Sequence, residues 1–362
     1  MILFMIEADT MRHVLKDFTK VYQILEDEES RDIYLNRLNW LISGEQKYLD
    51  AIVSAYLPKA PLFEGKTMTD LKKSLSKDRK VVLYGAGMAG KELLRDWAND
   101  ERFVGFCSQT KAKQRDGYCG YPVMSPEELL ERKDLNVIIA TLQFDEEIRQ
   151  ILLGGGYPAE QIFSYVDYYF YEDPEQYFGP DFMKYEADEV LVDAGCYNLN
   201  SSLKFREHCG RLKKIYAFEP DPENYAVCLE KKARFGLSEV QLFPAGVWSE
   251  ETVLHFSATN DGGSHISEEG AVTVPVMSID ETVDPADRVT MIKMDIEGAE
   301  LEALNGARKV IQRDRPKLAI CIYHKPEDMT EIPLYIKELV PEYKLYVRHH
   351  SNIDSETVLY AI

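Results

Sequence analysis

The chain has 362 residues, which is enough for two or three domains with cores of their own. Its 62 acidic residues outnumber its 42 basic residues and give a formal net charge of −20. Such a surface argues against nucleic acids and anionic membranes as partners, because both are bound through clustered Lys and Arg.

The cysteines and the N-terminus indicate a compartment. Six cysteines are scattered along the chain, with neither a CxxC pair nor a zinc-binding spacing. This pattern is typical of reduced thiols in a cytosolic protein. The opening MILFMI is too short for a signal peptide or a membrane span, and it has no basic flank. We therefore expect a cytoplasmic protein without a membrane partner.

Residues 1–77 are expected to form a helical N-terminal region. Ser30 is the predicted cap of a helix that ends at Gly44. The apolar residues that share a face in this helix are Tyr34, Leu38, Leu41 and Ile42. Those of the next helix are Leu49, Ile52, Val53 and Tyr56. We expect this region to be a structural or dimerising arm, so the chain could form a homodimer. A lid over a site is the less favoured alternative.

Residues 78–166 are expected to form a small Rossmann-like, doubly wound domain. KVVLYGAGMAGKELL predicts a strand, a glycine loop and a helix, and Gly85, Gly87 and Gly90 match GxGxxG. Further strands are predicted at 103–107 and 136–141, with a turn and a helix in YPVMSPEELL. The acidic residue that should meet a ribose after the second strand is missing, since CSQ stands at 107–109. A packing, sugar-nucleotide or degenerate module is therefore favoured over an NAD site.

Residues 167–189 are aromatic and acidic, and they are expected to connect two domains through packed aromatic side chains. A role in lining a substrate entrance is the alternative.

Residues 190–362 are expected to form a second α/β domain with a doubly wound sheet. VLVDAGCYN and YAFEPDPENY predict two strands joined by a helix, which is a βαβ unit. Further strands are predicted at 240–243, 291–295, 317–323, 343–350 and 357–362, the last two antiparallel to each other. Runs at 252–256 and 272–276 flank the DGG at 261–263 and predict an inserted hairpin.

The ends of the first two strands predict a nucleoside site. Ligands of open parallel sheets bind at the carboxyl ends of the strands, where Asp193 and Glu219 stand. We expect Glu219 to accept hydrogen bonds from both ribose hydroxyls and Asp193 to meet an amino-acid end, with Asn198 and Ser201 as helpers. Capping of the following helices is the alternative role for such acidic residues.

Small residues complete this predicted site. Gly195 lets the backbone approach a ligand closely, and Ala245 and Gly246 leave room for an adenine ring. The loop lacks the GxGxxG that wraps a pyrophosphate. These features fit S-adenosylmethionine, a nucleoside that carries an amino acid instead of phosphates.

Four motifs in order resemble the FkbM family of methyltransferases. They are VDAGCYN (192–198), FEPDPENY (218–225), IKMDIEGAELEAL (292–304) and PKLAICIYHKPED (316–328). The resemblance covers about residues 188–362 and implies a seven-stranded class I methyltransferase sheet and O-methylation. Leu199 departs from the family, which usually carries a second glycine there. The upstream module resembles those that precede sugar-modifying transferases.

A second set of residues is expected to act on the acceptor. Asp295 ends its strand, Glu297 follows in the turn, and His324 ends the next strand on the same sheet edge. The carboxylates could orient or deprotonate a hydroxyl, and a histidine with a pKa near 6.5 is a suitable base. The same three residues could hold a divalent cation, but no spacing enforces this, so no metal ligands are assigned.

We therefore predict an S-adenosylmethionine-dependent methyltransferase that modifies a hydroxyl of a small molecule, sugar or glycan. A non-catalytic binding or scaffold protein is one alternative, favoured by Leu199. The other is an NAD-dependent sugar-nucleotide enzyme, which rests on GAGMAG alone and lacks a Tyr-x-x-x-Lys pair near that domain.

Overall fold

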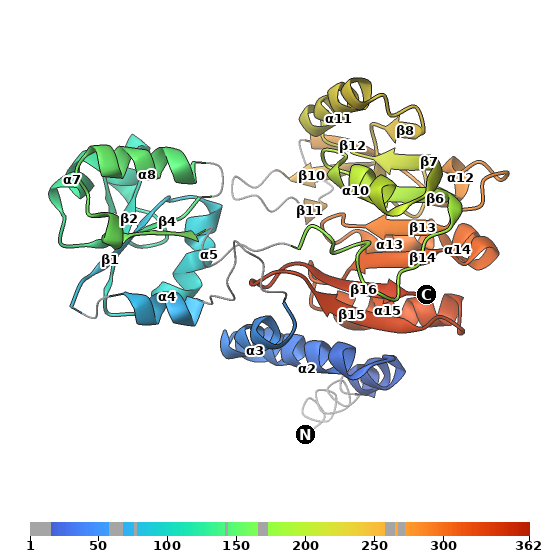
Figure 1. Cartoon of the computed structure of the whole chain (residues 1–362), viewed down its shortest axis with the longest axis horizontal. Helices are drawn as coiled ribbons and strands as arrows, with labels where there is room; N and C mark the ends of the chain where they lie inside the picture. Colours follow the sequence, from blue (N-terminus) through green and yellow to red (C-terminus); the bar gives the residue numbers. More distant parts are fainter. Residues whose placement is uncertain are drawn as a thin grey trace. The chain divides into compact units, whose positions relative to one another are not determined.

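The computed structural model describes residues 16–57, 68–75, 78–141, 144–165, 173–257, 265–266 and 272–362. Their contacts divide the chain into two compact units (Figure 1). The seven-stranded unit contains the described residues up to Glu45 and all of those after residue 172, and the five-stranded unit begins at Gln46. The expected helical region 1–77 is thus shared between the two units, and the other domain limits stay a prediction.

The seven-stranded unit is built on one mixed sheet with the strand order β15-β16-β14-β13-β6-β7-β8. Its strands are β6 (Ala187–Ala194), β7 (Arg211–Phe218), β8 (Val240–Phe243), β13 (Met291–Met294), β14 (Lys317–Cys321), β15 (Leu345–His349) and β16 (Thr357–Ala361). Strand β16 runs antiparallel to both of its neighbours, and the other neighbouring pairs are parallel. The seven predicted strands and the antiparallel final pair are confirmed.

Helices follow the strands of this sheet in α/β order. They are α10 (Asn200–His208), α11 (Pro222–Phe235), α12 (Ile279–Thr282), α13 (Glu300–Asn305), α14 (Arg308–Asp314) and α15 (Asp328–Leu339). Helices cover parallel sheets on both faces, so the central strands are buried. In β13 every residue is buried. Burying a charge in such a strand costs free energy unless the charge is paired. Asp193 and Lys293 are both buried in this core, so each needs a partner of opposite charge or hydrogen bonds.

A small four-stranded sheet is inserted in the same unit. It contains β9 (Gly246–Val247), β10 (Thr252–Ser257), β11 (His265–Ile266) and β12 (Val272–Met277). Strands β10 and β12 pair antiparallel, which confirms the predicted pairing of the two runs. The predicted DGG turn lies outside the described residues.

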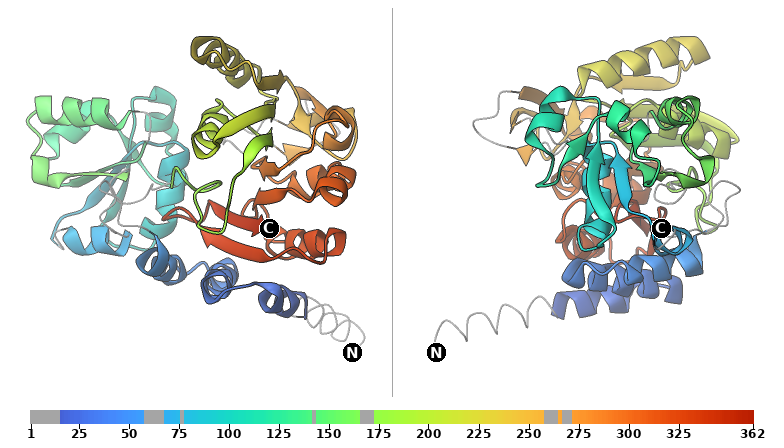
Figure 2. Two further views of the ribbon diagram at one scale, coloured as in Figure 1. Left: turned by 45° about the vertical axis from the view of Figure 1, so that its right-hand side comes forward. Right: turned by 90° about the vertical axis from the view of Figure 1, so that its left-hand side faces the viewer.

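Helix α2 (Glu28–Ser43) packs along the edge strand β15 (Figure 2). Ser30 Oγ accepts hydrogen bonds from the Val347 N–H (2.9 Å) and from Arg348 Nη1 (2.8 Å). An open sheet edge can pair with a strand of another chain, and α2 covers this edge. The predicted arm is therefore an integral cover of the sheet edge.

Two details of the α2 prediction are wrong. The N-cap is Asp27, whose carboxylate accepts the Ser30 N–H, so the helix begins before Ser30. Ile42 does not share the buried face, because its side chain is 80% exposed. The predicted end at Gly44 is confirmed by its left-handed backbone.

The five-stranded unit has an all-parallel sheet with the strand order β3-β2-β1-β4-β5. Its strands are β1 (Val81–Tyr84), β2 (Phe103–Cys107), β3 (Val123–Met124), β4 (Asn136–Ile139) and β5 (Ile162–Ser164). Its helices are α3 (Lys47–Tyr56), α4 (Met68–Ser74), α5 (Met88–Trp97), α6 (Lys111–Asp116), α7 (Pro126–Glu131) and α8 (Asp145–Gly154). The doubly wound fold is confirmed; β3 and β5 were not predicted, because runs of two and three residues show no periodicity.

The glycines of GAGMAG serve packing in this unit. A Cβ on Gly85 would lie 2.3 Å from Ala140 O, and one on Gly90 would lie 2.0 Å from Gly85 O. The carbonyl oxygen of Gly87 accepts a hydrogen bond from the Tyr118 hydroxyl (3.0 Å). Two of the three glycines are thus required by close backbone contacts, whether or not a nucleotide binds.

Candidate functional site

Asp193 ends β6 as a fully buried carboxylate beneath the loop that follows. Its Oδ2 accepts hydrogen bonds from the hydroxyls of Ser201 and Ser202, both at 2.7 Å, and its Oδ1 lies 3.4 Å from Lys293 Nζ. Asp193 and Lys293 face each other in the register between β6 and β13. In this arrangement Asp193 fixes the loop and the start of α10, and its Oδ1 has no hydrogen-bond partner among the described residues. Its expected role at the amino-acid end of a ligand stays a prediction.

Lys293 continues this network to the loop backbone. Its Nζ donates to the carbonyl oxygens of Gly195 (2.6 Å) and Ala194 (3.3 Å). Burial opposes the charged amine, but the carboxylates of Asp193 and Asp295 outweigh it and raise the pKa of Lys293. A permanently charged lysine therefore ties the first loop to the end of β13.

The loop after β6 is held in an unusual backbone conformation. Gly195, Tyr197 and Leu199 all have positive φ angles, of 75°, 52° and 63°. A Cβ on Gly195 would lie 2.0 Å from Asp295 O, so this glycine is needed for the approach of two loops to each other. Leu199, in the family's glycine position, takes the left-handed backbone and buries its side chain completely. Asn198 serves the loop as well, because its Oδ1 accepts the Asn200 N–H at 3.0 Å.

Glu219 follows β7 and is 5% exposed. Its Oε1 accepts the Asp221 N–H at 2.9 Å, and burial raises the pKa of its carboxyl. The predicted helix-capping role belongs to Asp221, which accepts the N–H groups of Glu223 and Asn224 at the start of α11. Glu219 therefore lies at the carboxyl edge of the sheet without a helix-capping role, and its expected contact with a ribose stays a prediction.

Ala245 and Gly246 lie beside the chain that leaves Glu219. A Cβ on Gly246 would lie 3.3 Å from a Val276 methyl and 3.9 Å from Pro220, so the backbone here passes close to the turn after β7. Ala245 is buried and also borders a shallow hollow of about 580 Å³ that is lined by residues of β10 and β12. These two residues could supply the backbone wall of an adenine pocket.

Asp295 directly follows β13 and contacts several residues of the second predicted set, which comprises Asp295, Glu297 and His324. Its Oδ2 accepts a hydrogen bond from the Tyr177 hydroxyl (2.8 Å), and its Oδ1 accepts one from the Tyr323 hydroxyl (3.3 Å). Burial opposes ionisation, but Lys293 and His324 outweigh it and lower the pKa of Asp295. The carboxylate therefore stays ionised and fixed in orientation.

His324 lies among three carboxylates. Its Nδ1 is 2.9 Å from Glu300 Oε1, and its Nε2 is 3.4 Å from Asp295 Oδ1 and 3.6 Å from Glu297 Oε2. Burial alone would lower the pKa of His324, but the surrounding carboxylates raise it to about 9. The expected neutral base with a pKa near 6.5 is therefore wrong for this arrangement, since the ring is mostly protonated at pH 7.

Glu297 differs from its neighbours because its side chain is 89% exposed. Its backbone is left-handed, with a φ of 57°, which is strained for a residue with a side chain. This backbone conformation places a solvent-accessible carboxylate at the sheet edge, next to His324. The structure thus brings Asp295, Glu297 and His324 together, as the sequence predicted.

Several residues of this site were missed from the sequence. They are Tyr177, Ser202, Lys293, Glu300 and Tyr323. A charged residue inside the apolar run MIKM was a usable signal for Lys293, and GAE, one turn after Glu297, was one for Glu300. Tyr177 lies in the aromatic connector, 118 positions from Asp295, so no local pattern could link them.

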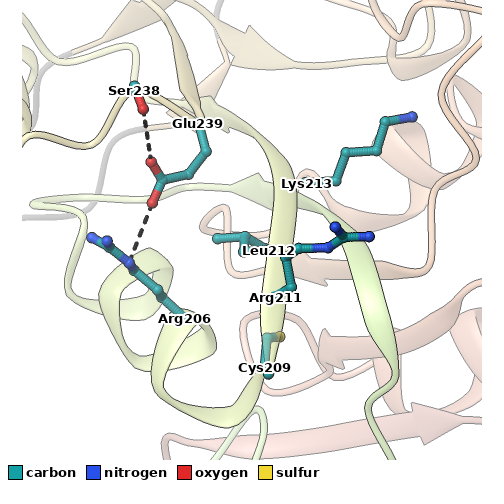
Figure 3. A pocket seen from close by; sticks show the side chains of 8 residues that line it. Arg206, Cys209, Arg211, Leu212, Lys213, Ser238 and Glu239 are labelled. Carbon is teal, nitrogen blue, oxygen red and sulfur yellow. Dashed lines mark hydrogen bonds and ion pairs between the residues drawn. The ribbon is translucent and has the colours of Figure 1, made fainter.

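A larger hollow, of about 610 Å³, lies at the opposite end of the strands, where β7 begins (Figure 3). The basic residues that line it are Arg206, Arg211 and Lys213. Each is paired with a carboxylate, namely Glu239, Asp188 and Asp287. This hollow is separate from the carboxyl edge and offers no unpaired cation among its lining residues.

No helix in the described part of the chain is long and apolar enough to cross a bilayer.

Two parts of the chain match models of known domains. Residues 193–343 match the family model of the methyltransferase FkbM domain, and residues 77–163 match the model of the N-terminal domain of C2185-like proteins. The 2-O-methyltransferase NoeI of Sinorhizobium fredii is 22% identical over 202 residues, which cover 48% of this chain and 80% of that protein.

A second relative is the hexuronic acid methyltransferase AglP of Haloferax volcanii. It is 30% identical over 132 residues, which cover 35% of this chain and 53% of AglP, so the match spans about half of that protein. The crystal structure of methyltransferase FkbM from Methylobacillus flagellatus has the same fold. It is 19% identical and has a TM-score of 0.50, over 88% of this chain and 98% of that one.

Proposed function

We propose, from the match of residues 193–343 to the model of the methyltransferase FkbM domain, that the chain transfers the methyl group of S-adenosylmethionine to a hydroxyl of a sugar or another small molecule. The observation that carries this proposal is the position of Glu219, Asp295, Glu297 and His324. Glu219 and Asp295 directly follow β7 and β13, and Glu297 and His324 lie three residues beyond the ends of β13 and β14, at the carboxyl edge of one sheet.

The residues present fit the cofactor. Glu219 is buried at the end of β7, has one oxygen held by the Asp221 N–H, and can accept hydrogen bonds from ribose hydroxyls. Gly195 and Asn198 lie in the loop that would meet the amino-acid end, and Asp193, Ser201 and Lys293 hold that loop from below. Ala245 and Gly246 would border the adenine. The carboxylates would also suit the positive charge of the sulfonium.

When bound, the cofactor supplies an electrophilic methyl group on a sulfonium, so the protein mainly provides alignment and takes up a proton. Asp295 is fixed by two tyrosine hydroxyls and can accept a hydrogen bond from the acceptor hydroxyl. His324, protonated at neutral pH, can donate from Nε2 to the acceptor oxygen or to Asp295. Glu297 is exposed and 3.6 Å from His324, which suits it to receive the released proton and pass it to water.

A sugar acceptor is supported by the relatives. AglP is named as a methyltransferase of hexuronic acid and NoeI as a 2-O-methyltransferase, and both match this chain at low identity. We therefore propose a sugar or glycan hydroxyl as the first acceptor class to test.

The test is formation of S-adenosylhomocysteine from S-adenosylmethionine in the presence of hexuronic acids, neutral sugars and a simple diol, followed by mass spectrometry. We expect product formation that depends on a sugar acceptor and is lost in Glu219→Ala, but retained in Glu230→Gln on the exposed face of α11. Binding of S-adenosylhomocysteine without turnover on any acceptor would favour a non-catalytic binding protein instead. Nicotinamide absorbance in the purified protein would favour the NAD-dependent alternative.

A further inference from the structure

Three side chains after β13 and β14 bring ligand atoms close enough to share one ion. One atom each from Asp295, Glu300 and His324 lies within 4.8 Å of the other two. Two ligands of one divalent ion, each about 2.1 Å from the metal, are at most about 4.2 Å apart. Side-chain shifts of a few tenths of an ångström would therefore close the set.

The same cluster contains buried polar atoms that lack hydrogen bonds. Glu300 is fully buried, and its Oε1 accepts the Ile296 N–H at 2.9 Å, whereas its Oε2 has no partner among the described residues. The His324 side chain is 8% exposed, and neither of its ring nitrogens has a hydrogen bond of acceptable geometry in the described part of the chain. A buried carboxylate oxygen without a partner is costly, and a bound cation would remove that cost.

Access and charge favour an ion at this place. Asp295, Glu297 and Glu300 put three carboxylates around one imidazole. Two lysines lie near this cluster, and both have partners. Lys293 is held by Asp193 and by two backbone carbonyl groups, and Lys325 donates to the carbonyl oxygen of Gly298. The side chain of Glu297 is exposed to solvent and its Oε2 lies 3.6 Å from His324 Nε2, so the cluster has one solvent-exposed member.

We propose that Asp295, Glu300 and His324 bind one divalent cation, with Glu297 as a further oxygen ligand from the exposed side. A histidine ligand must be neutral, so the ion would replace the proton that His324 holds in the metal-free chain. A mixed oxygen and nitrogen set suits ions of the Mn²⁺ class. The binding does not depend on the proposed methyl transfer. Its role does, because the ion would polarise the acceptor hydroxyl beside Asp295.

The test is a Mn²⁺ titration of the chelator-treated full chain, followed by electron paramagnetic resonance of the free ion. We expect one site, with affinity reduced about tenfold or more in His324→Gln and in Glu300→Gln. Glu230→Gln is the matched control for loss of an acidic or polar group far from the site, and it should bind Mn²⁺ like the unmodified chain. Glu300→Gln keeps an acceptor for the Ile296 N–H, so the local turn is retained.

Absence of binding at about 1 mM Mn²⁺, or equal affinity in all the variants, would overturn the proposal. Calorimetry with S-adenosylhomocysteine on the same samples separates the two proposals. Retained nucleoside binding without Mn²⁺ binding refutes only the metal site and also shows that the variants are folded. Mn²⁺ binding without nucleoside binding supports the metal site and counts against the methyltransferase proposal.

Discussion

Replacing Lys293 by Met should destabilise the seven-stranded unit strongly. Lys293 is 2% exposed and Asp193 is fully buried, and Nζ lies 3.4 Å from the carboxylate and 2.6 Å from Gly195 O. Methionine fills a similar volume but leaves Asp193 with only two serine hydroxyls. Removing one partner of a buried ion pair costs about 3–5 kcal/mol, because the other charge stays buried without compensation.

The assay is urea unfolding followed by circular dichroism, with the free energy of unfolding obtained by linear extrapolation. Lys293→Met should lose about 3–5 kcal/mol of unfolding free energy. Adding Asp193→Asn should restore part of this loss, because neither charge of the ion pair then remains. The control is Lys309→Met on the exposed face of α14, which should change stability by less than about 0.5 kcal/mol. A loss below about 1 kcal/mol in Lys293→Met would refute the idea that Asp193 depends on this lysine.

Two further predictions concern the loops of the site. Gly195→Ala puts a Cβ 2.0 Å from Asp295 O, at a φ of 75°. The control is Gly236→Ala, which has a φ of 59° and open space around the new Cβ, so it should lose only the roughly 1–2 kcal/mol of left-handed strain. Gly195→Ala should lose well over that amount of unfolding free energy, and equal losses of the two variants in urea unfolding would contradict the contact. Burial and Glu300 raise the pKa of Asp328 to about 7. The folded chain therefore holds a proton that the unfolded chain loses above about pH 4, and this contribution to stability falls as the pH rises to 7. In the presence of a chelator, the free energy of unfolding of Asp328→Asn should rise relative to that of the unmodified chain by about 2–3 kcal/mol between pH 5 and 8. A difference that does not change with pH would refute the raised pKa.

The sheet and its polar edge could be predicted because both depend on local patterns. Apolar runs that stop at Asp193, Glu219, Asp295 and His324 predicted strand ends, and parallel strands bring their carboxyl ends to one edge. The short SNIDSE connection between the last two runs predicted their antiparallel pairing. These features need no knowledge of strand register.

What depended on register or on distant packing could not be predicted. Lys293 meets Asp193 only because β13 and β6 pair with these residues opposite each other. Glu300 reaches His324 because the turn at Gly298, with a φ of 91°, redirects the chain into α13. The pKa of His324 follows from three carboxylates gathered in this way, so an ordinary value was the wrong expectation.

The N-terminal helix shows the same limit in another form. Ser30 has the residue type of a helix cap, but its hydroxyl accepts hydrogen bonds from β15, more than 300 positions away, and Asp27 caps the helix instead. A tertiary contact thus decided between two suitable capping residues.

The central claim is that Glu219 and the loop after β6 bind the nucleoside of S-adenosylmethionine. The most direct measurement is a calorimetric titration of S-adenosylhomocysteine into the full chain and into Glu219→Ala, with Glu223→Ala on the exposed first turn of α11 as the control. We predict a dissociation constant of about 10 μM, or roughly −7 kcal/mol, that is retained in the control and weakened at least tenfold in Glu219→Ala. Absence of binding at about 1 mM ligand, or equal affinity in all three proteins, would contradict the claim.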